Sequence, residues 1–132
     1  MSIVIENSFC KTWMDARGIT HIEYFNDTDI DLTKAKELIA LFVPKKDSPK
    51  LYILKDLRKI RSVSTDAMEY LSSRAITRFI LAEALIVNNL SSRLLANFFI
   101  KKYCSPEVDC EKFETEEEAI NWIFSKKQQK QN

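Results

Sequence analysis

The sequence predicts an α/β domain with a mixed sheet that is antiparallel at its start and parallel where helices cross over. Three features carry this prediction. The first 25 residues alternate apolar and polar side chains, as strands do. From residue 31 onward, segments with helical spacing alternate with short apolar runs. Residues 81–87, "LAEALIV", are almost entirely apolar, as expected of a central strand that is covered on both faces.

The composition is that of a single globular domain. The chain has 132 residues, of which 45% are hydrophobic and 30% are charged. We expect residues 1–127 to form one domain and residues 128–132 to form a disordered polar tail. Because 20 basic residues oppose 19 acidic ones, no nucleic-acid partner is expected. No apolar run reaches the roughly 18 residues of a membrane helix and no export signal is recognisable, which predicts a cytoplasmic protein.

Cysteine usage predicts reduced thiols. Cys10, Cys104 and Cys110 are an odd set, so a complete disulfide framework within one chain is impossible. The chain has one histidine and no Cys-x-x-Cys motif. The sequence therefore predicts neither a metal site nor a cofactor.

The first elements are strands. "SIVIEN" and "FCKTWMD" alternate well enough to be half-buried, and "ITHIEYF" follows after a break. Gly18 is the single glycine of the chain, and it stands where a hairpin turn needs a residue that tolerates positive φ. On the strand after this turn, His21 is expected to face solvent.

Helices and strands then alternate. Residues 31–43 have helical spacing, with Asp31 as a cap and Pro44 as a stop. "LYILKDL" is the next strand, and a helix after residue 64 turns Ala67 and Met68 inward together with Tyr70 and Leu71. Residues 91–103 form another helix, "VDCEKF" is a last short strand, and residues 115–127 close the chain as a helix. The spacing of Thr115 and Glu118 in that helix is typical of a capping box.

Polar side chains follow the strands of this sheet and are expected at one edge. The carboxyl ends of neighbouring parallel strands meet at the same edge, which is the usual binding site of an open α/β sheet. Loops after residues 25, 54 and 87 should therefore converge into an anion site or a partner-docking face. An alternative is that these residues only cap helices and form turns. The candidate edge residues are Asp56, Arg58, Arg61, Asn88, Asn89, Ser91, Ser92 and Arg93, with the hydroxyls of Ser64 and Thr65 beside them.

Two charged features favour structural roles. Lys55, Arg58, Lys59 and Arg61 are expected to form a solvated basic loop. Glu83, inside an apolar strand, is expected near the amino end of that strand, with a structural or rim role. No catalytic residues are predicted, because the sole histidine is far in sequence from the hydroxyl loops and one glycine cannot build a phosphate loop.

The helix "SSRLLANFFIKKY" has more apolar side chains than one core-facing stripe can hold. One face can pack on the sheet, and the remainder must contact other parts of the chain, a second copy or an apolar ligand. Core burial alone is one interpretation, and homodimerisation is the sharper hypothesis. The candidate dimer or ligand face is formed by Leu95, Phe98, Phe99 and Tyr103.

The element order and the segment "KDLRKIRSVSTDAMEY" resemble the STAS domain, the fold of SpoIIAA-like anti-sigma-factor antagonists. In that family a strand ends in Asp and a loop leads to an Asp-Ser-Ser-Gly-type turn at a helix start, where a partner kinase phosphorylates one serine. The resemblance implies that Asp56 is the strand-end Asp and that Thr65, with Ser64 beside it, is the candidate phosphoacceptor. This chain departs from the pattern, since Ser64 replaces the acidic residue and Ala67 the glycine.

Two further segments, "SSRLLANFF" and "EKFETEEEAINWI", are similar to a group of small, uncharacterised single-domain bacterial proteins of STAS-like fold. The architecture is also similar to the lipid-binding CRAL-TRIO fold. The resemblance therefore implies a non-enzymatic regulatory or protein-interaction module that binds a regulator or a kinase, and the apolar helix of residues 91–103 predicts that it is a homodimer. Its alternative is a domain that binds a small apolar, lipid-like ligand beside Phe98 and Phe99.

Overall fold

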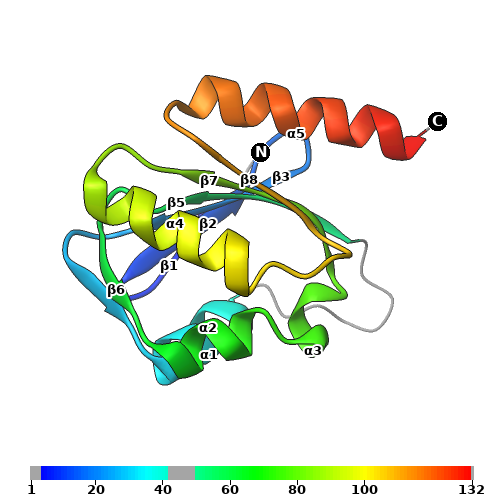
Figure 1. The fold of residues 1–132 in the computed structure, drawn as a ribbon. Helices are drawn as coiled ribbons and strands as arrows, with labels where there is room; N and C mark the ends of the chain where they lie inside the picture. Colours follow the sequence, from blue (N-terminus) through cyan, green and yellow to red (C-terminus); the bar gives the residue numbers. More distant parts are fainter. Residues whose placement is uncertain (1–3, 42–49, 132) are drawn as a thin grey trace.

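A computed structural model describes residues 4–41 and 50–131 of the chain. Its centre is a six-stranded sheet in the order β1-β2-β3-β5-β7-β8. Figure 1 shows the last helix of the chain above this sheet and the other helices below it. The strands are β1 (Ile5–Glu6), β2 (Cys10–Met14), β3 (Ile19–Tyr24), β5 (Leu51–Asp56), β7 (Ile80–Ile86) and β8 (Asp109–Phe113). The helices are α1 (Leu32–Ala40), α2 (Thr65–Leu71), α3 (Arg74–Thr77), α4 (Leu90–Lys102) and α5 (Glu116–Gln131).

The sheet is antiparallel at one end and parallel over the rest, as predicted. β1, β2 and β3 pair antiparallel, and the turn between β2 and β3 contains Gly18 at a φ of 83°. β3, β5, β7 and β8 all run in the same direction. The N–H of Leu57 donates to the carbonyl of Ile86 over 2.9 Å, so the exits of β5 and β7 lie side by side.

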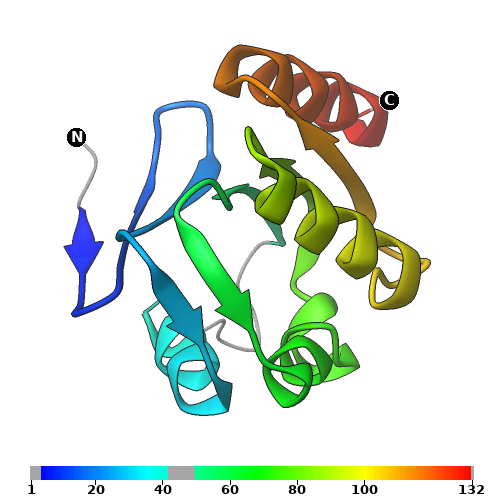
Figure 2. The same ribbon diagram turned by 60° about the vertical axis from the view of Figure 1, so that its left-hand side comes forward.

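A second, two-stranded parallel sheet was not predicted. It pairs β4 (Thr28–Ile30) with β6 (Ile60–Val63), two segments that the sequence analysis treated as loops. Figure 2 shows this ribbon running from the main sheet toward α1 and α2. Ile30 and Ile60 hold these strands in the core, where both are buried, while Asp29 is half-buried and Arg61 and Ser62 are exposed.

Side-chain caps begin the longer helices where the sequence predicted them. The Asp31 carboxylate accepts from the N–H of Lys34 over 2.9 Å, and the Thr115 hydroxyl accepts from the N–H of Glu118 over 3.2 Å. Phe42 and Pro44, the predicted end of the first helix, lie outside the described residues. α5 continues to Gln131, so residues 128–131 are helical where a disordered tail was expected.

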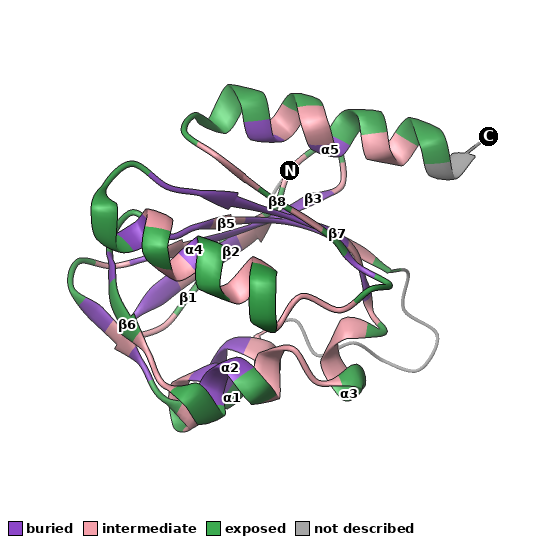
Figure 3. Cartoon of the chain, viewed as in Figure 1, coloured by how far each residue is buried: buried purple, intermediate pink, exposed green. Residues whose placement is uncertain are grey.

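Each face of the sheet has its own core. Beneath α5, the buried cluster includes Ile19, Leu54, Ala84 and Ile123. The opposite face, covered by α1, α2 and α4, buries a larger cluster that extends from Phe9 to Val108. In Figure 3 the buried residues are concentrated in β5 and β7, and β7 is the central covered strand that its composition predicted.

Three expectations from the sequence are wrong. Cys104 and Cys110 are joined in a disulfide, with Cα atoms 6.6 Å apart, because the turn after α4 returns the chain directly into β8. Cys10 is a free, buried thiol whose pKa burial raises to about 11. Lys55 belongs to β5 rather than to a solvated loop, and Glu83 lies in the middle of β7 rather than near its amino end.

Lys55 and Glu83 form a buried ion pair on the face beneath α4. Their side chains are 12% and 6% exposed, and the Lys55 Nζ lies 2.7 Å from the Glu83 Oε1. Burial acts to lower the pKa of Lys55, but the Glu83 carboxylate and Tyr24 outweigh it and the pKa is raised. The Lys55 ammonium therefore keeps its charge in the core beside Glu83.

Candidate functional site

The carboxyl ends of β5 and β7 bring part of the predicted edge together. The Asp56 carboxylate accepts from the backbone N–H of Arg58 over 3.0 Å and from its guanidinium over 2.9 and 2.7 Å. The Asn89 side-chain amide donates to the carbonyl of Arg58 over 3.3 Å. These three residues, which are separated by up to 33 positions in sequence, therefore share one edge.

The arginines of this edge are already paired with carboxylates. Arg58 is held by Asp56, and Arg93 donates to Glu114 over 2.7 Å. Arg61 forms a two-point ion pair with Asp29, to which Ser62 also donates over 2.6 Å. This pairing holds the pKa of Asp29 below its ordinary value. The edge is therefore closer to neutral than the sequence suggested.

The two candidate phosphoacceptors are not at this edge. β6 carries the chain away from Asp56 to the start of α2, where the N–H of Ser64 donates to the carbonyl of Ile30. The Ser64 hydroxyl caps α2 by accepting from the N–H of Ala67 over 3.3 Å. Thr65 is exposed in the first turn of that helix.

Asn88, Asn89 and Ser92 build the start of α4. The Asn89 side chain accepts from the N–H of Ser92 over 2.7 Å, and the Ser92 hydroxyl accepts from the N–H groups of Asn88 and Asn89. Ser92 is buried, whereas Ser91 is exposed. For these residues the geometry is that of helix capping, the alternative left open by the sequence.

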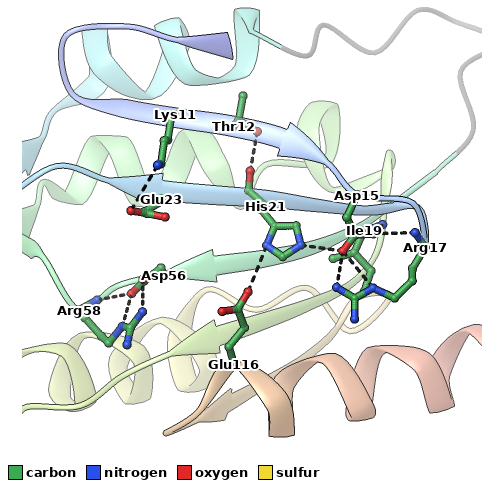
Figure 4. Close-up of polar contacts among 10 residues, drawn as sticks. All are labelled: Lys11, Thr12, Asp15, Arg17, Ile19, His21, Glu23, Asp56, Arg58 and Glu116. Carbon is green, nitrogen blue, oxygen red and sulfur yellow. Dashed lines mark hydrogen bonds and ion pairs between the residues drawn. The ribbon is translucent and has the colours of Figure 1, made fainter. Parts of the chain in front are cut away.

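A polar cluster that the sequence analysis missed lies on the α5 face of the sheet (Figure 4). His21 of β3 was expected to face solvent, but it is 4% exposed. Its ring stacks on Trp13 of β2, with ring centroids 4.8 Å apart. Its Nε2 lies 2.8 Å from the Asp15 Oδ2, and its Nδ1 lies 3.7 Å from the Glu116 Oε1. The first turn of α5, which arrives from the far end of the chain, accounts for this burial.

Groups other than His21 also hold the Asp15 carboxylate in place. Its carboxylate accepts from the N–H groups of Arg17 and Ile19 and from the Arg17 guanidinium. Burial acts to raise the pKa of Asp15, but the bonds from His21, Arg17 and the backbone outweigh it and lower the pKa to about 2. An ionised Asp15 can only accept, so the Nε2 of His21 must carry the proton of this bond.

A small polar cavity adjoins this histidine. Its volume is about 100 Å³. Three carboxylates and one guanidinium line it, and the guanidinium already belongs to the Asp56–Arg58 pair. The lining residues are Trp13, His21, Ile22, Glu23, Leu54, Asp56, Arg58, Ile86 and Glu116. Within residues 4–41 and 50–131, no group of three or more His, Cys, Asp or Glu side chains has the arrangement of a metal site.

The sequence contained one signal for this cluster. In a hairpin that turns at Gly18, the register places Trp13 opposite His21, and Asp15 stands in the turn. This pairing follows from local sequence alone. The approach of Glu116 does not, because it depends on how α5 packs across the sheet.

The candidate dimer or ligand face of α4 is divided between two directions. Leu95 and Phe99 pack against the core. Phe98 is exposed, and its ring makes an edge-to-face contact with the ring of Tyr103. Leu90 and Leu94 are exposed on the same side of α4 as Phe98. We call Leu90, Leu94 and Phe98 the α4 row.

An apolar cavity lies beneath α4. Its volume is about 40 Å³, a space for a few water molecules. Leu95 and Phe99 close it on one side, and Lys55 lies on its floor. The lining is otherwise formed by Tyr24, Ile30, Leu57, Ile60, Val63, Met68, Leu71 and Leu85.

Comparison with known proteins identifies the family and the fold. A family described as "Domain of unknown function (DUF7793)" matches residues 12–127. The chain belongs to this family. A solved structure from Shewanella loihica PV-4, an uncharacterized protein of the DUF3478 family with a SpoIIAA-like fold, is similar with a TM-score of 0.60. The similarity covers 93% of this chain and 92% of that chain. Among curated proteins, none matches.

The structural similarity concerns the fold alone, since the two chains share 10% sequence identity. The predicted mixed sheet and SpoIIAA-like fold are therefore confirmed. The family match spans both the His21 cavity and the α4 row. In the part of the chain that the structure describes, no helix is long and apolar enough to cross a membrane.

Proposed function

We propose that the protein is a non-enzymatic regulatory or protein-interaction module that acts as a homodimer through the α4 row. The observation that carries this proposal is the exposure of Leu90, Leu94 and Phe98, which are 70%, 59% and 47% accessible. Large apolar side chains that gather on a surface are typical of interaction sites. The SpoIIAA-like fold of the structural neighbour supports the same kind of role.

A second copy of the chain suits this row because the row is self-complementary. Its members are spaced at i, i+4 and i+8 along α4, so antiparallel packing about Leu94 places Leu90 of one copy against Phe98 of the other. No charged residue lies between Leu94 and Phe98. The same packing sends Lys101 and Lys102 of the two copies to opposite ends of the interface.

Sedimentation velocity over a dilution series tests the dimer. We expect the wild-type chain to sediment as a dimer that dissociates on dilution. Phe98→Glu should raise the dissociation constant at least about 10-fold, because it places a charge against the apolar Leu90 of the other copy. Monomer at every concentration of the wild-type chain would remove the proposal.

Phe124→Glu is the matched control. Phe124 is also a helical phenylalanine and is 49% exposed, but it lies on α5, across the sheet from α4. Its substitution should leave the sedimentation profile unchanged. Equal effects of the two substitutions would mean that α4 is not the interface.

A phosphate on Thr65 or Ser64 would switch binding to a regulator or kinase. The exposure of Thr65 in the first turn of α2 supports access by such an enzyme. The phosphate would add close to two negative charges beside the Arg61–Asp29 pair on the adjoining strands. Mass spectrometry of protein from its native cells should find phosphate within residues 62–65. The absence of this phosphate under every growth condition would contradict the switch.

A cytoplasmic location of the protein stays a prediction.

A small apolar ligand is the second candidate function, and the cavity beneath α4 favours it. Because that cavity is about 40 Å³, a lipid-like ligand requires α4 to move outward. Native mass spectrometry distinguishes the two functions. A co-purifying apolar molecule supports ligand binding, and a bare dimer supports the interaction module.

A further inference from the structure

The Cys104–Cys110 disulfide joins the end of α4 to β8 across a short turn. Cys104 lies two residues beyond the end of α4, and Cys110, six positions later, is the second residue of β8. Both residues are half-buried, so the bond lies near the surface. Cys10 is 0% exposed, and its raised pKa keeps it a thiol. The chain therefore has one accessible sulfur pair and one inert thiol.

Core packing and hydrogen bonds hold the turn between the two cysteines independently of the disulfide. The N–H of Val108 donates to the carbonyl of Ser105 over 3.0 Å, and Val108 is 5% exposed in the core beneath α4. Cys110 is held in β8, where it pairs opposite Glu83 of β7. Breaking the S–S bond therefore leaves the turn and β8 in place.

The reduced form has a partner for its thiol in the same turn. The Cys104 Sγ lies 3.3 Å from the carbonyl oxygen of Val108, so an S–H at this position has an acceptor within reach. The carbonyl oxygen of Ser105 is 3.7 Å from the same sulfur. One arrangement of the backbone therefore accommodates both oxidation states, as a reversible site requires.

The disulfide ties the last turn of α4 to the sheet. The N–H groups of Tyr103 and Cys104 both donate to the carbonyl of Phe99, over 2.8 and 3.0 Å. Hydrogen bonds at a helix end open readily when nothing else holds that end. The Tyr103 ring also contacts the ring of Phe98, with centroids 5.8 Å apart. Loss of the S–S bond would therefore reach Phe98, a member of the α4 row, through Tyr103.

We propose that Cys104 and Cys110 form a reversible redox site, at which a low-molecular-weight thiol opens the disulfide and releases the last turn of α4 from β8. The site goes beyond the α4-row dimer, and only its effect on that dimer rests on the proposed function.

The reaction is thiol–disulfide exchange, with glutathione as the example of the thiol. Its thiolate attacks one sulfur of the bond and forms a mixed disulfide, while the other cysteine leaves as a thiolate and takes up a proton. A second glutathione thiolate attacks the glutathione sulfur of the mixed disulfide and expels the remaining cysteine, which is protonated in turn. The protein gains two electrons and two protons, and two glutathione molecules become one glutathione disulfide.

A count of free thiols tests the chemistry. Wild-type protein is equilibrated in glutathione buffers, quenched with acid, alkylated with N-ethylmaleimide in denaturant and weighed by mass spectrometry. We expect one free thiol, that of Cys10, in excess oxidised glutathione and three in excess reduced glutathione, with return to one on reoxidation. Cys10→Ser should lower each count by one and leave the transition at the same buffer ratio. One free thiol in every buffer, or three in every buffer, would overturn the proposal.

Hydrogen exchange followed by NMR in the two buffers measures the release of α4. The amides of Tyr103 and Cys104 should exchange at least about 10-fold faster in the reduced protein. The amide of Arg93 is the internal control, because it donates to the carbonyl of Asn89 at the other end of α4. Its exchange should be the same in both buffers. Unchanged rates at Tyr103 and Cys104, or equal acceleration at Arg93, would overturn the proposal.

The double variant Cys104→Ala, Cys110→Ala is the matched control for the buffers themselves. It lacks the bond in both, so its Tyr103 amide should exchange at the rate of the reduced wild type in either buffer. A dependence on the buffer in this variant would mean that glutathione acts elsewhere, and would contradict the assignment.

Sedimentation velocity in the same buffers tests the effect on the α4 row. We expect the dissociation constant of the wild-type dimer to rise at least about fivefold on reduction. An unchanged constant together with faster exchange would contradict transmission through Tyr103 to Phe98. A chain that is monomeric in both buffers would remove the proposed dimer alone, because the thiol counts and exchange rates decide the redox site without it.

Discussion

Buried titratable side chains have different partners on the two faces of the sheet. Under α4, Lys55 and Glu83 form a pair in which each charge has its counter-charge at 2.7 Å. Under the first turn of α5, His21 has one satisfied nitrogen and one that faces a carboxylate. The first contact joins neighbouring strands of the sheet, whereas His21 combines a short contact to Asp15 with a longer one to Glu116 of a distant helix. The buried polar groups of the two faces are therefore held by different parts of the fold.

The cover on each face explains the difference. Several helices and the β4–β6 ribbon close the face that holds Lys55 and Glu83 (Figure 2). On the other face the cover is α5, which packs mainly on β5, β7 and β8. Beside the start of α5, the sheet is consequently accessible at Glu23 of β3 and at Arg58, which follows β5.

Breaking the complete pair should have the largest effect. Glu83→Gln leaves the Lys55 ammonium buried without a counter-charge, and we expect it to lower the free energy of unfolding by about 3–5 kcal/mol. Urea denaturation measures this value. The double variant Lys55→Met, Glu83→Leu should recover most of the loss, because the charge is removed together with its partner. A loss below about 1 kcal/mol for Glu83→Gln would contradict a buried pair.

Removing the charge of Asp15 should have the next largest effect. The pKa of Asp15 is about 2 in the folded chain against an ordinary 3.8, which corresponds to about 2 kcal/mol of stability at pH 7. Because the folded pKa is the lower one, this stabilisation is complete above about pH 4 and is lost as the pH falls toward 2. The difference in unfolding free energy between wild type and Asp15→Asn, followed by urea denaturation, should therefore shrink over that range. A difference that does not depend on pH would contradict the assignment.

The fold was predictable from local sequence where one residue or one run decides the structure. Gly18 determined the first turn, the apolar run at 81–87 determined the central strand, and Asp31 and Thr115 determined two helix starts. The β4–β6 ribbon was not predictable in this way. Its strands have three and four residues, too few for the alternation of side chains to exceed chance.

The candidate site depends on contacts between distant segments. Lys55 and Glu83 lie diagonally on neighbouring strands, so their pairing follows from the register that sets Ile53 opposite Glu83. His21 is buried by a helix that begins at residue 116, almost 100 positions later in the chain. Neither the register nor this packing is encoded in a local pattern. The sequence therefore predicted the edge but not the groups that are buried beside it.

The polar residues at the start of α4 provide a smaller test, of the structural interpretation of that edge. Asn89→Ala removes the side chain that accepts from the N–H of Ser92, and we expect a loss of about 1 kcal/mol in the free energy of unfolding. Ser91→Ala is the control, because Ser91 is exposed, and it should change this value by less than about 0.5 kcal/mol. Thermal or urea denaturation compares the two. Equal losses would mean that Asn89 is not the cap.

The smallest effect concerns the contact between His21 and Glu116. Glu116→Gln and Glu117→Gln each remove a negative charge from the start of α5, which costs about 0.3–1 kcal/mol through the helix dipole. Glu116→Gln also removes the carboxylate oxygen that lies 3.7 Å from the Nδ1 of His21. In paired urea titrations, Glu116→Gln should therefore destabilise the chain more than Glu117→Gln does. Equal losses would mean that this contact contributes nothing to stability.

The protonation of the His21 ring tests the central claim most directly. In ¹⁵N NMR spectra at pH 7, we expect a proton on Nε2, because the ionised Asp15 accepts from Nε2. In Asp15→Asn the amide can donate to Nε2, so Nε2 should lose that proton. A wild-type ring without a proton on Nε2, or an Nε2 in the same state in both proteins, would contradict the account.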